Sequence, residues 1–170
     1  MSLQPSRTSI WAASARAVGS RFDEPVRNPD WLADKLMGPD ERAMIAGHPL
    51  ATALVAPAAG RASARIGHYL IAQGYDVLPI TPSHARVYGR PSLPSLDAMT
   101  SAPDLVLCFR RSEAMPEIAR AAVQRRARSL WMQTGIVNEE AADLALAAGL
   151  SVVMDRCIQV DHRTWLAEGG

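Results

Sequence analysis

From residue 51 onward, short apolar runs rich in β-forming residues alternate with segments of helical pattern, and no other feature limits the possible folds as strongly. Each run is apolar almost throughout, as expected of a strand in a parallel sheet that is covered on both faces. Five such runs occur: ATALVA (51–56), YDVLPI (75–80), DLVLCF (104–109), SLWMQ (129–133) and SVVMD (151–155). The alternation predicts βαβ units, and therefore an α/β fold with an open parallel sheet of about five strands.

Three segments between these runs carry helix signals. The segment ASARIGHYLIAQG has apolar residues on one helical face and ends in Gly74. The segment SEAMPEIARAAVQRRA begins with Ser112, which is a predicted N-cap, and NEEAADLALAAG begins with Asn138 in the same role and ends at Gly149. Right-handed crossovers through these helices place helices on both faces of the sheet and all strand carboxyl ends at one edge.

The first fifty residues have a different texture. Asn28 and Pro29 predict the start of a short helix that ends at Gly38, and a second short helix follows and ends at Gly47. We therefore expect a domain boundary near residue 50, with a helical appendage over residues 1–50 and the α/β domain over residues 51–170.

Composition narrows the functional classes. The chain has 170 residues, 48% of them hydrophobic, which is enough for one domain with a core. Its net charge of +1 gives no broad field that would favour nucleic acid or an anionic membrane. The two cysteines, Cys108 and Cys157, have neither disulfide-framework nor metal-site spacing. No apolar run has the length of a membrane span, and the first residues lack a secretory signal, so we expect a cytoplasmic protein without a metal site.

The exits of the strands carry the candidate binding residues. After the first run, Gly60, Arg61 and Ser63 lead into a helix N-terminus, where free backbone N–H groups favour phosphate. The same residues are also compatible with a simple helix cap. After the second run begins a long loop that contains several prolines, and loops of this length in a compact domain are often functional.

Two further exits add polar groups. Arg110 and Arg111 stand side by side at the start of a predicted helix, where cations are unfavourable unless an anion is shared. Gln133 and Gly135 follow the fourth run, and they supply a side-chain amide and a turn. Together the exits predict a cleft for a phosphorylated, nucleotide-like small molecule.

These residues carry a family resemblance. The stretches GYDVLPITP, VYGRPSLPSL, FRRSEAMPEI and WMQTGIVNEEAADLALAAGLSVVMDRC resemble the small stand-alone CoA-binding proteins, whose fold matches the CoA-binding domain of the succinyl-CoA synthetase α subunit. The resemblance runs from about residue 51 to about residue 160. It implies a Rossmann-like fold that binds CoA at the strand exits. It assigns the CoA phosphates to the turn Arg61–Ser63, and the adenine end to Thr81 and Pro82 and to Phe109–Arg111.

The first turn departs from this family pattern. The family usually has a longer, glycine-containing loop that ends in Arg-Pro-Ser, whereas this chain has the shorter VAPAAGRAS, with Ala62 in place of the proline. The early glycine is missing, and Pro57 offers no backbone N–H. We therefore expect the cradle for the phosphates, and with it CoA affinity, to be weakened.

A second resemblance concerns residues 1–50. They are similar to the lead-in helices of S-adenosylmethionine-dependent methyltransferases of the leucine carboxyl methyltransferase type, but the glycine-rich methyltransferase core does not follow. A methyltransferase fragment or fusion is therefore one alternative function. Another is a structural or interaction module whose nucleotide cleft has degraded.

No pattern indicates a catalytic centre. The nucleophile motif GxSxG is missing, and the four histidines are scattered along the sequence. Cys157 follows Arg156, which would favour a thiolate, although a packed thiol at a strand end is the alternative reading. The preferred hypothesis is a small cytoplasmic protein that binds CoA or an acyl-CoA without demonstrable catalysis. Its enzyme status stays open.

Overall fold

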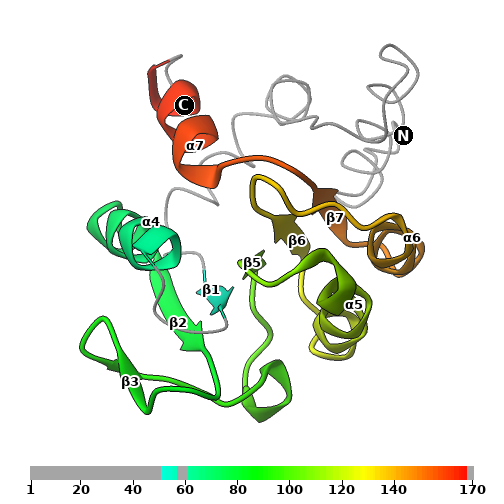
Figure 1. Ribbon diagram of the computed structural model, residues 1–170, viewed down its shortest axis with the longest axis horizontal. Helices are drawn as coiled ribbons and strands as arrows, with labels where there is room; N and C mark the ends of the chain where they lie inside the picture. The colour runs from blue at the N-terminus through cyan, green and yellow to red at the C-terminus, as the bar shows by residue number, and fades with distance from the viewer. Residues whose placement is uncertain (1–50, 57–60, 168–170) are drawn as a thin grey trace, which may run out of the picture.

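The computed structural model describes residues 51–56 and 61–167. The predicted helical appendage with its methyltransferase-like sequence lies outside the described residues, and so does the turn 57–60. In the described part, a parallel sheet of five strands lies between two layers of helices (Figure 1). The predicted α/β fold, with an open parallel sheet and helices on both faces, is confirmed.

The sheet strands begin and end within two residues of the predicted runs. They are β1 (Ala51–Val55), β2 (Asp76–Ile80), β5 (Leu105–Cys108), β6 (Ser129–Met132) and β7 (Ser151–Val153). Their order across the sheet is β2-β1-β5-β6-β7, and all neighbouring pairs are parallel. The first connection runs outward to β2 and the later ones run the other way, so the chain order reverses between β1 and β5.

Residues of each strand alternate between two apolar cores. In β5, Val106 and Cys108 belong to one core cluster, while Leu105 and Leu107 belong to the other. All four residues are buried, which explains why the run is apolar throughout.

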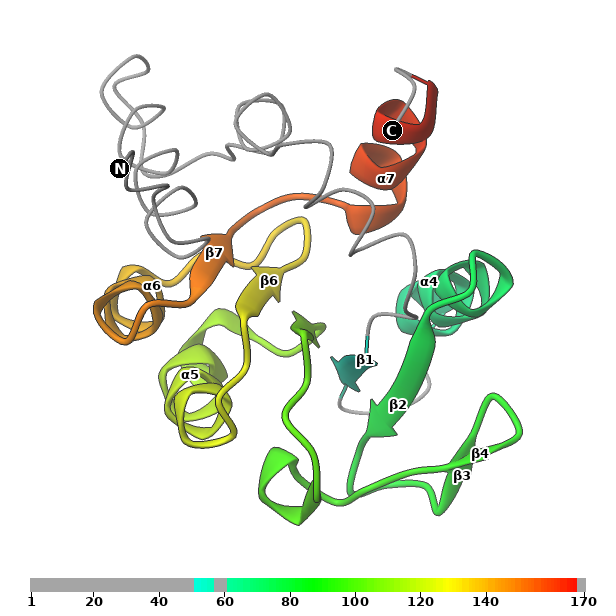
Figure 2. The ribbon, with the colours of Figure 1, turned by 180° about the vertical axis from the view of Figure 1, so that it is seen from behind.

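Each core is covered by its own pair of helices. The helices α4 (Arg61–Ala72) and α7 (Ile158–Ala167) cover one face, and α5 (Met115–Gln124) and α6 (Glu139–Ala147) cover the other (Figure 2). The helices α5 and α6 turn alanines toward the core, and Ala119, Ala141 and Ala145 are fully buried. Small side chains let two helices approach each other and the sheet closely. None of the helices in the described ranges is long and apolar enough to cross a bilayer.

The helix caps agree with the sequence at one predicted start and differ at another. Asn138 caps α6, because its Oδ1 accepts a hydrogen bond of 2.8 Å from Ala141 N. The prediction that Ser112 is the N-cap of α5 is wrong. Ser112 begins the short 3-10 helix η2 (Ser112–Ala114), and its Oγ accepts a hydrogen bond of 3.2 Å from Val137 N. That hydroxyl therefore ties the loop after β6 to the start of η2, instead of closing a helix.

The long loop after β2 has structure that the sequence analysis did not predict. It contains a hairpin of two short strands, β3 (Arg86–Val87) and β4 (Arg90–Pro91), and then the 3-10 helix η1 (Leu96–Ala98). Leu93 N donates to Pro79 O over 3.0 Å, and Thr81 N donates to Leu93 O over 2.8 Å. The loop is thus attached to the end of β2.

The last helix, α7, was not predicted either. An aromatic cluster of Tyr69, Tyr75, His162 and Trp165 attaches it to α4, and the Tyr69 hydroxyl and His162 Nδ1 share a hydrogen bond of 2.8 Å. Burial lowers the pKa of His162 below its usual 6.5, because the charged imidazolium would lose water. Burial, together with the neighbouring Tyr69, raises the pKa of Tyr75 to about 12.

Candidate functional site

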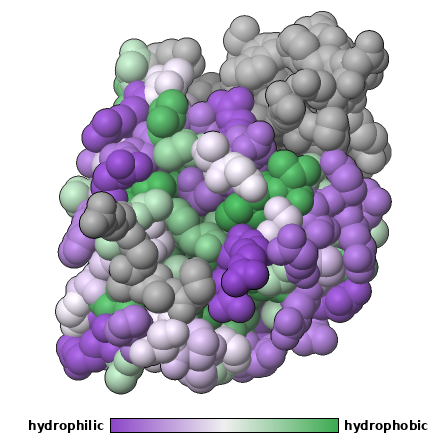
Figure 3. Space-filling model, viewed as in Figure 1, coloured by the Kyte–Doolittle hydropathy of each residue, from purple (hydrophilic) through white to green (hydrophobic). Residues whose placement is uncertain are grey.

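The carboxyl ends of the strands lie at one edge of the sheet, and backbone hydrogen bonds hold the residues that follow them in line. Phe109 N donates to Val55 O over 2.8 Å, and Gln133 N donates to Cys108 O over 3.3 Å. Ligands of open α/β sheets bind in the crevice beside the strands where the chain order reverses, which here are β1 and β5. Figure 3 shows apolar side chains in the middle of the visible face, over β1, β5 and β6, with hydrophilic side chains around them.

The exit of β5 presents two positive charges. Phe109 packs partly against the core on the α4 side, Arg110 is half-buried and Arg111 is exposed. Neither guanidinium has a hydrogen-bond or ion-pair partner among the described residues. The helical segment that begins at Ser112 follows directly. Two unpaired cations at the start of a helical segment make this exit suited to an anion.

The exit of β6 presents a buried amide. Gln133 is only 5% exposed, and its Nε2 has no hydrogen-bond partner in the described part of the chain. A tight turn follows, in which Ile136 N donates to Gln133 O over 2.9 Å and Gly135 has φ +81°. A positive φ at the third position of a turn favours glycine. The turn therefore fixes the backbone of Gln133, while its side chain keeps a donor that is shielded from water.

The residue after β7 holds this turn. Asp155 Oδ1 accepts a hydrogen bond of 2.7 Å from Gly135 N, and Asp155 N donates to Ile136 O over 3.2 Å. Asp155 itself has φ +55°. Asp and Asn are among the few non-glycine residues that adopt this conformation with any frequency.

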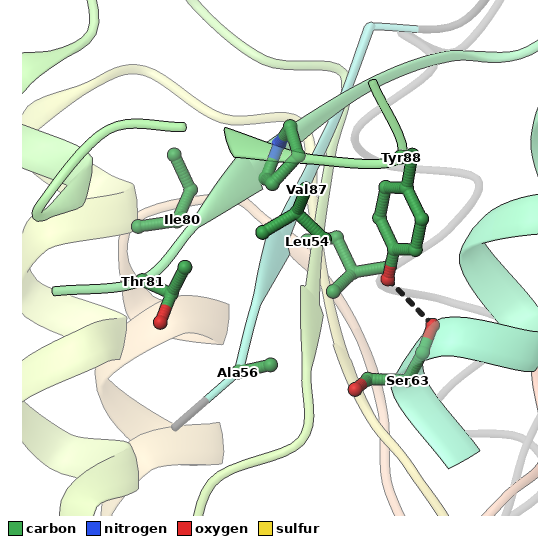
Figure 4. A pocket seen from close by; sticks show the side chains of 8 residues that line it. Leu54, Ala56, Ser63, Ile80, Thr81, Val87 and Tyr88 are labelled. Atoms are coloured by element: carbon green, nitrogen blue, oxygen red, sulfur yellow. Dashed lines mark hydrogen bonds between the residues drawn. The ribbon is translucent and has the colours of Figure 1, made fainter. Parts of the chain in front are cut away.

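The exits of β1 and β2 contain a cavity of only about 10 Å³. Figure 4 shows Ser63 and Thr81 on its wall, on opposite sides. The residues that line it are Leu54, Ala56, Ser63, Pro79, Ile80, Thr81, Val87 and Tyr88. This volume is about that of one water molecule, so the cavity in this conformation has no room for a nucleotide ring.

Tyr88 closes this cavity. Tyr88 and Gly89, with φ +55° and +71°, form the two-residue turn of the β3–β4 hairpin. The Tyr88 hydroxyl donates to Ser63 O over 2.7 Å, and the ring lies where Gly67 has no side chain, because a Cβ there would be 2.6 Å from the Tyr88 Oη. The His68 and Tyr88 rings pack in a T-shaped arrangement with a centroid distance of 5.0 Å. Burial raises the pKa of Tyr88 to about 12, so its hydroxyl remains a donor at neutral pH.

The structure places the candidate residues from the sequence in two groups. Ser63 and Thr81 line the small cavity, while Pro82 is exposed and does not line it. The other group lies at the exits of β5 and β6 and consists of Phe109, Arg110, Arg111, Gln133 and Gly135. Gly60 lies outside the described residues, and Arg61 is described only as the first residue of α4.

Sequence reasoning missed Tyr88 and Asp155. The signal for Tyr88 was the Tyr-Gly pair in VYGR, together with Gly67 in the middle of a helical pattern. The signal for Asp155 was weaker, since its role depends on the neighbouring position of β6 and β7.

The thiols and possible metal ligands add little to this edge. Cys108 is fully buried, and burial raises the pKa of its thiol to about 12. Cys157 is half-buried and packs against the α4-side core. Within residues 51–56 and 61–167, no three His, Cys, Asp or Glu side chains are grouped in a way that could hold a metal ion.

Comparison with known families decides the relationship of the chain. The family described as the CoA binding domain matches residues 51–163, which include all strands and nearly all helical residues described above. The chain belongs to this family. Its predicted resemblance to CoA-binding proteins is therefore confirmed at the level of the domain.

Individual relatives agree with this assignment. The protein YneT of Bacillus subtilis (strain 168), which is described as uncharacterized, is 37% identical over 89 residues; these cover 52% of this chain and 66% of YneT. A hypothetical protein from Pyrococcus horikoshii OT3 has a similar structure, with a TM-score of 0.67 and 29% identity over 76% of this chain and 93% of that one. A structure from Thermus thermophilus matches with a TM-score of 0.64 and 28% identity, over 75% and 98% of the two chains.

Proposed function

We propose that this CoA-binding domain binds CoA or an acyl-CoA at the carboxyl edge of its sheet and acts as a binding module. The observation that carries the proposal is the buried Gln133 Nε2, which has no hydrogen-bond partner among the described residues, beside Arg110 and Arg111, which are also unpaired there. A buried donor without a partner destabilises a folded protein by about 1–3 kcal/mol, and a ligand acceptor would remove this cost. The family membership of the chain identifies CoA as the ligand to test first.

The chemistry of the edge suits the parts of this ligand. CoA carries phosphates, which accept charge-assisted hydrogen bonds from guanidinium groups, and neutral amide carbonyls, which accept from an uncharged donor. Arg110 and Arg111 would hold phosphate, and Gln133 would meet a neutral acceptor. The net charge of +1 leaves this local pair of cations, and not a general basic surface, to attract the anion.

Calorimetric titration with CoA at one fixed salt concentration tests the proposal. Arg110→Ala and Arg111→Ala should each weaken binding by about 1.5–3 kcal/mol, because each removes a charge-assisted contact. Arg128→Ala is a matched control, since Arg128 lies at the opposite edge of the sheet and pairs with Asp104 at 3.3 Å. Wild-type affinity in both exit variants would contradict the proposed site.

One observation favours a second candidate, a structural or interaction module. The cavity at the exits of β1 and β2 is closed by Tyr88, and its volume of about 10 Å³ has no room for a ligand ring in the present conformation. Under this alternative the wild-type protein fails to bind CoA in the same titration. A parallel titration with S-adenosylmethionine tests the methyltransferase alternative, which predicts binding of that ligand in place of CoA.

A further inference from the structure

The turn after β6 is held from three neighbouring segments. Gln133 N bonds to Cys108 O at the end of β5, Val137 N bonds to Ser112 Oγ, and Gly135 N bonds to Asp155 Oδ1. Among these three partners, Asp155 is the one that bonds to the turn in both directions, because its own N–H donates to Ile136 O over 3.2 Å. Asp155 therefore fixes the two residues that close the turn on the far side of Gln133.

The neighbouring Arg156 does not compete with the turn for the carboxylate of Asp155. The adjacent Arg156 turns to α7, where its Nε and Nη2 donate to Asp161 over 2.8 Å and 2.6 Å. The backbone of Arg156 is fixed as well, because its carbonyl oxygen accepts a hydrogen bond of 2.8 Å from Trp131 Nε1. With the neighbouring cation bonded to Asp161, the short bond to Gly135 N is the hydrogen bond that the Asp155 carboxylate makes among the described residues.

The backbone conformation of Asp155 shows that this contact has a cost. A non-glycine residue at φ +55° is destabilised, and such strain is kept where surrounding contacts enforce it. The turn held by this contact starts at Gln133, a residue that is only 5% exposed and whose Nε2 has no partner in the described ranges. Without a fixed backbone, the Gln133 side chain could rotate so that its amide forms hydrogen bonds with water.

We infer that Asp155 is a positioning residue for ligand binding: it holds the turn Gln133–Ile136 so that the Gln133 amide stays oriented into the edge. The inference rests on the proposed function, because the amide is assumed to meet the ligand. Asp155 itself touches no ligand in this scheme. Its effect passes through the backbone of Gly135 and Ile136 to Gln133.

Two substitutions separate the side-chain bond from the strained backbone. Asp155→Gly removes the carboxylate but accepts a positive φ freely, and Asp155→Asn keeps both an acceptor and a tolerance for that φ. In a CoA titration, Asp155→Gly should weaken binding about tenfold, whereas Asp155→Asn should stay within about threefold of wild type.

Repeating the Asp155→Gly titration in a Gln133→Met background distinguishes positioning of the Gln133 amide from a purely structural role of Asp155. If Asp155 acts through Gln133, Asp155→Gly should change CoA affinity less than about twofold once the amide is gone. An equal loss of affinity in both backgrounds overturns the inference, because the two residues would then act independently.

Hydrogen exchange on the ligand-free protein tests the turn separately from the ligand. The Gly135 amide should exchange about tenfold faster in Asp155→Gly than in wild type, and Asp155→Asn should retain most of the protection. Unchanged exchange in Asp155→Gly overturns the inference. A wild-type protein that does not bind CoA overturns the proposed function, and the exchange comparison still decides whether Asp155 holds the turn.

Discussion

The two ends of the carboxyl edge differ in how their polar groups are satisfied. At the β1–β2 end, defined by Ser63, Thr81 and Tyr88, the described side chains enclose a cavity of only about 10 Å³, and the Tyr88 hydroxyl donates to Ser63 O. At the β5–β6 end, Gln133 and the neighbouring Arg110 and Arg111 keep donors without partners among the described residues. Under the proposed function, the second end is where a ligand would supply the missing hydrogen-bond acceptors. Removing a polar group should therefore destabilise the protein at the β1–β2 end and stabilise it at the β5–β6 end.

The largest effect should come from filling the space that Tyr88 occupies. Gly67→Ala places a Cβ against the Tyr88 ring, so the ring must move, and the free energy of unfolding should fall by about 1–3 kcal/mol. Denaturant unfolding measures this change. In a Tyr88→Ala background the same substitution should instead gain up to about 1 kcal/mol, because alanine favours the helix. The same loss in both backgrounds would contradict the packing of Tyr88 on Gly67.

The β5–β6 end should respond in the opposite direction. Gln133→Met replaces a buried amide by an apolar chain of similar length, so the unfolding free energy should rise by about 1–2 kcal/mol. CoA affinity should fall at the same time, since a donor for the ligand is lost. Denaturation and titration of one purified variant give both values. A less stable variant with unchanged CoA affinity would remove the contrast between the two ends.

The hydroxyl of Tyr88 should have a smaller effect. Tyr88→Phe keeps the ring beside Gly67 and His68 but loses the 2.7 Å bond to Ser63 O, which should lower the unfolding free energy by about 1 kcal/mol. Its sign is opposite to that of Gln133→Met, although both substitutions delete one polar group. If Tyr88→Phe were more stable than wild type, the β1–β2 end would also contain a polar group whose removal is favourable, and the contrast between the two ends would be lost.

The smallest effect concerns α7, which belongs to neither end. Because burial lowers the pKa of His162 in the folded state, the unfolded chain binds its proton more readily. Stability from this group should therefore be complete above about pH 6.5 and decrease as the pH falls below it. His162 faces Tyr69, Tyr75 and Trp165, and the neighbouring cation Arg163 lies over the Tyr69 ring.

His162→Phe is the control for this pH effect, because it keeps an aromatic ring in the cluster and removes the titrating group. Unfolding curves between pH 8 and pH 5 should be flatter for the variant than for wild type. An unchanged slope would assign the pH dependence to other groups.

Much of the sheet could be predicted because its strands are buried on both faces. A run such as residues 104–109 is apolar at every position of the strand, and this pattern needs no knowledge of neighbours. Asn138 could be recognised for a similar reason, since an N-cap contacts a residue only three positions ahead. The boundary near residue 50 stays a prediction.

The parts that failed depend on contacts between distant segments. The β3–β4 hairpin has strands of two residues, which are too short to show a periodic pattern. The Tyr88 ring in its turn packs on Gly67, which lies 21 positions earlier in the sequence. Ser112 has the sequence signature of a cap but bonds to Val137, which the fold brings to it. For the site, position after a strand was enough to select Gln133. Its buried Nε2 without a partner in the described ranges, and its link to Asp155 through the turn, depend on the packed structure.

The buried thiol of Cys108 can serve as a natural probe for opening of the sheet. The chain has two cysteines. Cys108 lies fully buried in the central strand β5, where burial raises the pKa of its thiol to about 12, whereas Cys157 is half-buried directly before α7. A thiol-reactive dye should therefore label Cys157 on the folded protein and reach Cys108 only when the sheet separates. The rate of the second labelling step then measures how often the centre of the sheet opens, with no engineered probe.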